Sequence, residues 1–153
     1  MFQLSVESVF SAAHALMFRG ALEPLHRHDW QVTVCIEGPD LDGDGVLWDF
    51  HEIELLVSAS TAPFANGNLN QSEPFATCTD SGAWELKSNP SAEAVARHIG
   101  ERVGESLRTK VQSLLARYPK MEGGSPGWPS GVRLVSVRVT EAAGCAATWL
   151  TNR

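Results

Sequence analysis

The stretch LHRHDWQVTVCIE at residues 25–37 alternates apolar and polar side chains over its second half. Val32, Val34 and Ile36 fall on one parity, and polar residues occupy most of the other. A period of two is typical of a half-buried β-strand, whose successive side chains point to opposite faces. The segment therefore predicts a strand that runs to about Glu37 and ends before a Gly-Pro break.

Two histidines, His26 and His28, stand at the start of this strand. Residues two apart on a strand project from the same face, roughly 6–7 Å apart along the backbone, so both imidazoles can converge on one metal ion. His14 follows a first predicted strand at residues 2–10, and antiparallel pairing would bring it to the same face. Three histidines leave the fourth zinc position open, as catalytic sites do. An isolated His-x-His pair is more typical of a polar strand end without metal than of a metal site.

The remaining pattern predicts two helices and further strands. Residues 46–48 form a short apolar run that predicts a third, short strand. Asp49 with Glu52 is typical of a helix N-terminus. Residues 65–88 are polar and irregular, which indicates a functional or mobile loop. Asn89 and Pro90 predict the N-cap and first position of a long amphipathic helix that ends at Pro119. Strands are predicted at residues 132–140 and 146–150, after a Gly/Pro connector at residues 121–131.

The order of these elements predicts one α+β domain over residues 1–153, with an antiparallel sheet that carries two helices on one face. The net charge is −6 and charged residues make up 20% of the chain, with no basic stripe, so nucleic acid is not an expected partner. No apolar run approaches the roughly 18 residues of a membrane span. Three cysteines without a C-x-x-C pair indicate a reducing, cytoplasmic location. The apolar N-terminus lacks the basic region of a signal peptide.

Six segments in this order resemble the 6-pyruvoyl-tetrahydropterin synthase / 6-carboxytetrahydropterin synthase family. They are FSAAH (10–14), LHRHDWQV (25–32), GVLWDF (45–50), LN (69–70), NPSAE (89–93) and VRVTE (137–141). The resemblance implies the tunnelling fold, in which subunit sheets assemble into a barrel, usually as a homo-oligomeric hexamer with sites at subunit interfaces. It also implies Zn²⁺ held by His14, His26 and His28.

The resemblance further implies that Glu141 anchors a pterin ring. A carboxylate can accept two parallel N–H bonds from the guanidine-like edge of a pterin, and its charge strengthens them. Glu141 shares the parity of Val137 and Val139, so it is expected to face the buried side of the sheet. An ordinary solvated carboxylate at a strand end is the alternative. Glu93 is expected to complement the dipole of the long helix rather than bind a ligand.

The chain departs from the family at its catalytic base. Family members usually carry a cysteine shortly before the His-x-His element, whereas this chain has no cysteine between His14 and His26. Glu23, three residues before His26, resembles a variant subgroup in which glutamate replaces that cysteine. A carboxylate beside Zn²⁺ can act as a general base. A solvated loop glutamate remains the equal alternative.

A second departure removes the family's Asp-His proton relay. Ala65 and Asn66 occupy the matching positions, and neither side chain can relay a proton. A long insertion at residues 71–88 contains Cys78, a further candidate base or nucleophile. Cys35 and Cys145 are expected to be buried small hydrophobes, and His51 and His98 to be solvated.

The sequence therefore predicts a zinc-dependent lyase acting on 7,8-dihydroneopterin triphosphate or a related pterin, by elimination or retro-aldol cleavage of the side chain. In this hypothesis Glu23 is the candidate base and Glu141 fixes the ring. The alternative is a zinc- and pterin-binding homologue without the usual synthase activity, which the missing cysteine and relay favour. A purely structural zinc protein is less well supported, because an open three-histidine site suits structural zinc poorly.

Overall fold

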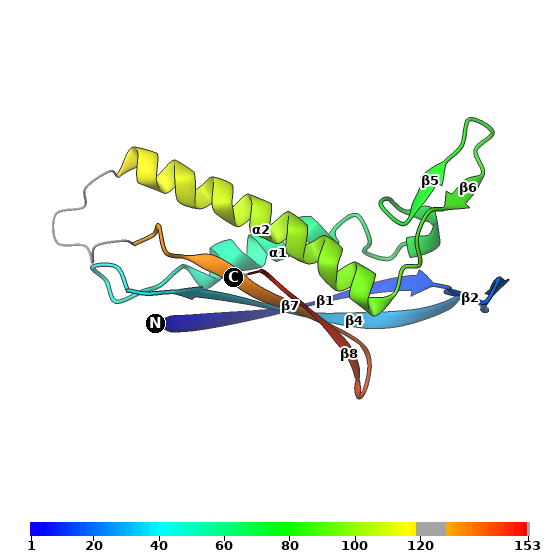
Figure 1. Ribbon diagram of the computed structural model, residues 1–153, viewed down its shortest axis with the longest axis horizontal. Coiled ribbons are helices and arrows are strands. Elements are labelled where there is room, and N and C mark those ends of the chain that lie inside the picture. Colours follow the sequence, from blue (N-terminus) through cyan, green and yellow to red (C-terminus); the bar gives the residue numbers. More distant parts are fainter. Residues whose placement is uncertain (119–127, 153) are drawn as a thin grey trace.

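A computed structural model describes residues 1–118 and 128–152. One long sheet lies under two helices, and two short hairpins extend from one end (Figure 1). The elements are β1 (Phe2–His14), β2 (Met17–Phe18), β3 (Ala21–Leu22), β4 (His26–Gly38), α1 (Phe50–Thr61), η1 (Leu69–Gln71), β5 (Ala76–Cys78), β6 (Trp84–Leu86), α2 (Ala92–Arg117), β7 (Arg133–Ala142) and β8 (Cys145–Leu150).

The main sheet is antiparallel with the strand order β1-β4-β7-β8. β1 and β4 pair along their full length, from Phe2 opposite Gly38 to His14 opposite His26. This register follows from the alternating apolar residues of both strands, because a slip by one residue would turn every apolar side chain to the other face. The pairing therefore also fixes which histidines meet.

Helices α1 and α2 cover one face of the sheet and bury the apolar parity of its strands (Figure 1). Trp30, Val32 and Val34 of β4 are fully buried under them. The ring of Trp149 in β8 packs directly on Gly100 of α2, where an added Cβ would overlap it. The predicted α+β class, the antiparallel sheet and the helices on one face are confirmed.

Several local predictions need correction. Residues 46–48 form no strand, although Leu47 and Trp48 are buried. The N-cap of α2 is Ser91, whose side chain accepts a hydrogen bond from the amide of Ala94, whereas the Asn89 side chain bonds the backbone of Met17. The region expected to be irregular contains η1 and the β5–β6 hairpin. α2 ends at Arg117, and both Pro119 and most of the predicted connector lie outside the described residues.

Two side-chain environments also differ from expectation. Cys145 is exposed and Cys35 is half-buried, so neither behaves as a fully buried hydrophobe. His98 is half-buried rather than solvated, because α2 places its ring 5.4 Å from that of Phe64 and 6.2 Å from that of Phe75. No helix in the described part of the chain combines the length and apolar character that a membrane crossing requires.

Candidate active site

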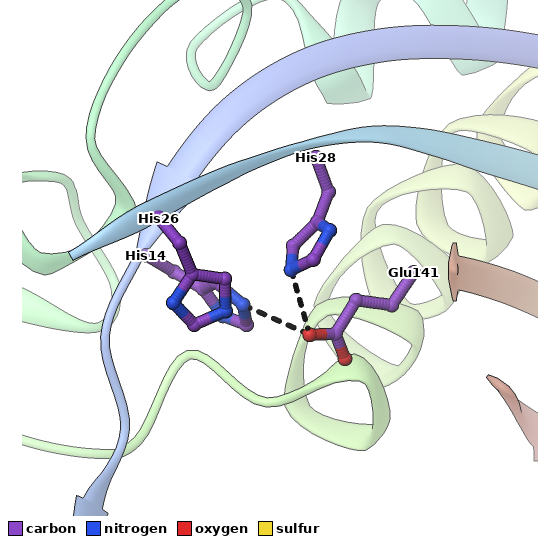
Figure 2. A group of neighbouring side chains, drawn as sticks. All are labelled: His14, His26, His28 and Glu141. Atoms are coloured by element: carbon purple, nitrogen blue, oxygen red, sulfur yellow. Dashed lines mark hydrogen bonds and ion pairs between the residues drawn. The ribbon is translucent and has the colours of Figure 1, made fainter. Parts of the chain in front are cut away.

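Four side chains from three strands converge on the helix-covered face of the sheet (Figure 2). His14 ends β1, His26 and His28 begin β4, and Glu141 lies near the end of β7. One possible ligand atom from each residue lies within 4.8 Å of all the others. The cluster arises because all four residues share the parity of the buried apolar side chains on their strands. Arg27, between the two histidines, points to the opposite face and donates to the Ser11 hydroxyl at 3.3 Å.

The histidines present one ring nitrogen each to the centre of this cluster. The Nδ1 of His14 lies 2.8 Å from the Pro90 carbonyl oxygen, and the Nδ1 of His26 lies 2.9 Å from that of Pro24. A carbonyl can only accept, so each Nδ1 carries its proton and each Nε2 keeps a lone pair for a metal. The Nε2 of His28 is buried and makes no hydrogen bond of acceptable geometry. A buried nitrogen without a hydrogen-bond partner is available to bind a metal ion.

Burial lowers the pKa of His28 below 6.5; the Glu141 carboxylate opposes the shift, whereas His14 and His26 reinforce it. A lowered pKa keeps the imidazole neutral, which is the form that binds metal. Tetrahedral Zn²⁺ with bonds of about 2.0–2.1 Å needs ligand atoms roughly 3.3 Å apart, so modest side-chain adjustment would close this cluster on an ion.

The carboxylate of Glu141 bridges two of the histidines. Its Oε1 lies 3.0 Å from Nε2 of His14 and 3.1 Å from Nε2 of His28. The same side chain lines a cavity of about 530 Å³, together with the first turn of α2 and the start of β8. Glu93 also lines this cavity, so its position is not limited to the helix-dipole role expected from the sequence. Glu141 can therefore serve either the metal or a ligand in the cavity.

Glu23 directly follows the β2–β3 hairpin and lies beside His26. Its Oε1 is 3.9 Å from Nδ1 of His26 and accepts a hydrogen bond of 2.9 Å from the amide of Leu16. Its own amide donates to the Leu16 carbonyl at 3.0 Å. These two bonds hold Glu23 at the edge of the histidine cluster.

Two asparagines clamp the segment that joins His14 to this hairpin. Asn70 accepts from the amide of Ala15 and donates to its carbonyl, both at 2.7 Å. Asn89 makes the same pair of bonds to Met17, at 2.7 and 2.9 Å. Each side-chain amide thus makes the pair of backbone hydrogen bonds that a neighbouring strand would otherwise make. Sequence reasoning missed this role, because the contacts join residues 55 and 72 positions apart.

Other candidates are not brought to the cluster. Cys78 is exposed in β5, and its thiol contacts the Thr79 carbonyl at 3.7 Å. Ala65 and Asn66 follow α1 in a turn, where the Asn66 amide donates to the Ser11 carbonyl at 2.6 Å. No other group of three or more metal-ligating side chains occurs within residues 1–118 and 128–152.

The family model described as 6-pyruvoyl tetrahydropterin synthase matches residues 3–151, nearly the whole chain. The chain belongs to this family. No curated protein sequence gives a significant match. The predicted family and the tunnelling fold of its subunit are thereby confirmed.

Solved structures share this fold over almost their full length. The Plasmodium vivax 6-pyruvoyltetrahydropterin synthase, in a mutant whose catalytic glutamate is replaced by alanine, is 18% identical with a TM-score of 0.67, covering 99% of this chain and 98% of that one. The Caenorhabditis elegans 6-pyruvoyl tetrahydropterin synthase is 17% identical with a TM-score of 0.66, covering 99% and 96%. At such identities the likeness shows the fold alone.

Proposed function

We propose that the protein is a zinc-dependent lyase that processes the side chain of a 7,8-dihydropterin, by elimination or retro-aldol cleavage. Membership of the pterin synthase family supports the substrate class. The observation that carries the proposal is the convergence of His14, His26, His28 and Glu141 beside a cavity large enough for a bicyclic ring.

Each residue has a distinct role in this proposal. The three histidines would hold Zn²⁺, which when bound would polarise a side-chain oxygen of the substrate and acidify its hydroxyl. Glu141 turns toward the cavity it lines and accepts two N–H bonds from the pterin edge. Glu23 removes the side-chain proton, since its carboxylate lies at the edge of the histidine cluster. A glutamate is the catalytic residue mutated in the Plasmodium vivax enzyme, which supports this choice over Cys78.

The test is turnover by the zinc-loaded protein with 7,8-dihydroneopterin triphosphate, followed by chromatography of the pterin products. Glu23→Gln keeps the shape and removes the base, so we expect binding to persist while turnover falls by about 10²–10⁴-fold. Equal turnover by the wild type and Glu23→Gln would remove Glu23 from the mechanism. No turnover by the wild type, with pterin binding retained, would favour the alternative of a binding homologue, as the missing Asp-His relay does.

Glu141 needs a separate test, because its Oε1, 3.0 and 3.1 Å from the Nε2 atoms of His14 and His28, also fits a fourth metal ligand. In Glu141→Gln the amide keeps one oxygen acceptor but cannot accept two parallel N–H bonds. If Glu141 anchors the ring, zinc content stays at one per protomer and pterin affinity falls. Loss of zinc from Glu141→Gln would instead indicate a closed metal site and would contradict the anchor role.

We further propose that the active form is a cytoplasmic homo-oligomer, a hexamer by family resemblance. The edge strands β1 and β8 expose Val9 and Leu150, which a neighbouring sheet would cover. Three free cysteines are consistent with a reducing compartment. Light scattering of the purified protein tests the assembly, and a monomer at micromolar concentration would contradict it.

A further inference from the structure

We propose that Trp30 is a positioning residue for the metal site, whose indole holds the rings of His14 and His28 in the orientation that binds the ion. The inference rests on the proposed function for the identity of the metal ligands, and not on the substrate. Trp30 belongs to β4 and stands two residues after His28, so its side chain lies on the same face of the sheet. It is fully buried, so its ring cannot be reoriented without repacking of its neighbours.

The indole meets two of the histidines edge-on. Its ring centroid is 4.8 Å from that of His14, with the planes at 80°, and 5.8 Å from that of His28, with the planes at 90°. Edge-to-face contacts with centroids about 4.5–7 Å apart are a favoured arrangement of aromatic rings. His14 is itself fully buried, so its ring cannot turn without displacing the indole. One side chain therefore limits the rotation of two candidate metal ligands that come from different strands.

The indole N–H ties the same ring to β1. The Nε1 of Trp30 donates a hydrogen bond of 3.1 Å to the carbonyl of Ala12, which is fully buried and lies two residues before His14. A buried indole N–H usually finds such a partner, and here the bond fixes how the ring is turned. It joins β4 to β1 at the end of the sheet where the histidines stand, in addition to the backbone pairing of the two strands.

His28 depends on this packing more than the other two histidines do. The Nδ1 atoms of His14 and His26 are held by backbone carbonyls at 2.8 and 2.9 Å. Within residues 1–118 and 128–152, neither ring nitrogen of His28 makes a hydrogen bond of acceptable geometry. In the same residues, Trp30 is the only ring in contact with His28 that is not itself a candidate ligand. The indole therefore supplies the restraint that a carbonyl supplies elsewhere in the cluster.

Two buried phenylalanines hold Trp30 in place. Phe10 of β1 stacks on the indole with centroids 6.0 Å apart and planes at 6°, and Phe64 lies 6.0 Å from Phe10. A positioning residue must itself be locked by packing, which this aromatic row provides. The row also gives the histidines an apolar neighbourhood, which limits access of water to a bound ion.

The zinc affinity of Trp30→Phe, measured by chelator competition on the folded full-length protein, tests the inference without turnover. The substitution keeps a ring in the core but removes the N–H bond and the outer part of the indole, so the affinity should fall by about tenfold. Trp48→Phe is the matched control. Trp48 is 3% exposed, its Nε1 finds no partner in the part of the chain that the structure describes, and it follows the Gly38 end of β4, away from the histidines. Its loss should lower the free energy of unfolding but leave the zinc affinity unchanged.

A spectroscopic readout separates positioning of the ligands from loss of stability. Co²⁺ bound in place of zinc has visible absorption bands that depend on its coordination geometry. We expect the bands of Trp30→Phe to differ from those of the wild type, and the bands of Trp48→Phe to coincide with them.

A measurement on the wild-type chain serves if Trp30→Phe does not fold. In protein labelled with 5-fluorotryptophan, one of the five tryptophan fluorine signals should shift when zinc is added. That signal should still be present, and still respond to zinc, in Trp48→Phe and Trp84→Phe.

The outcomes distinguish this inference from the proposed function. If the wild type binds no zinc, the metal site fails and the inference falls with it. If the wild type binds zinc, but Trp30→Phe binds it as tightly and with the same Co²⁺ bands, Trp30 only fills the core and the inference alone is wrong. The absence of any fluorine signal that responds to zinc would overturn it as well.

Discussion

Replacement of Asn70 by alanine is expected to destabilise both the fold and the metal site. The substitution removes two hydrogen bonds of 2.7 Å to Ala15, a residue that is only 2% exposed. Each lost bond costs about 1 kcal/mol, and a buried group left without a partner costs more, so the free energy of unfolding should fall by about 2–4 kcal/mol. For a chain of this size that corresponds to a decrease in Tm of roughly 5–15 °C.

The metal site should weaken as well, because Ala15 directly follows His14. Loss of a group that orients a metal ligand typically costs about 10–100-fold in affinity, and here the orientation is indirect, so we expect about tenfold. Urea denaturation of the zinc-free protein measures the free energy of unfolding, and competition with a zinc chelator measures the zinc affinity. The wild type and its variants must be measured at one protomer concentration, since assembly alters apparent stability.

Asn89→Ala is the matched control, because it removes the same pair of bonds from Met17, which is 40% exposed. Water can replace those bonds, so a loss of about 0.5–1 kcal/mol is expected. Equal losses in the two variants would refute the reasoning that burial of Ala15 sets the cost. An unchanged zinc affinity in Asn70→Ala would show that the clamp does not position His14.

Three further predictions concern the rest of the molecule. Burial lowers the pKa of His98 below 6.5, so the unfolded chain binds the proton more readily and the free energy of unfolding should fall as pH drops through about 6.5; His98→Gln should remove this part of the pH dependence. Gly100→Ala should cost about 1–3 kcal/mol in urea denaturation because its Cβ overlaps Trp149, whereas Gly104→Ala meets its neighbour at an ordinary 3.4 Å and should cost less. Cys78→Ser should keep turnover within about twofold of the wild type, and a large loss would restore Cys78 as a candidate base.

The sequence alone predicted the parts of the site that depend on strand periodicity. The two histidines of β4 share a face because they are two residues apart, and Glu141 faces the same side because it continues the parity of Val137 and Val139. The antiparallel pairing that brings His14 opposite His26 was also predictable, since both strands carry a strong alternating pattern. Local patterns of this kind determine register, and register determines the cluster.

Contacts made by isolated polar side chains could not be predicted in the same way. Asn89 precedes a proline and a helix, which favours an N-cap, yet Ser91 caps α2 and Asn89 bonds Met17 instead. Such a choice depends on where the β2–β3 hairpin lies relative to α2, and that is a tertiary relation. The short strand predicted at residues 46–48 failed for a related reason, since apolar residues can be buried in a loop as well as in a strand.

The loop after α1 keeps a structural role, although it lacks the side chains that would relay a proton. Asn66 donates its amide to the Ser11 carbonyl at 2.6 Å, and the amide of Ala13 donates to the Gly67 carbonyl at 2.9 Å, so the backbone of this loop is docked on β1 just before His14. Asn70, three residues further, completes the docking through its clamp. The relay side chains are therefore absent from a loop that still supports His14, the candidate metal ligand. In the proposed mechanism such a loss would change proton transfer without removing the metal site, and Glu23, 3.9 Å from the His26 ring, would take the proton.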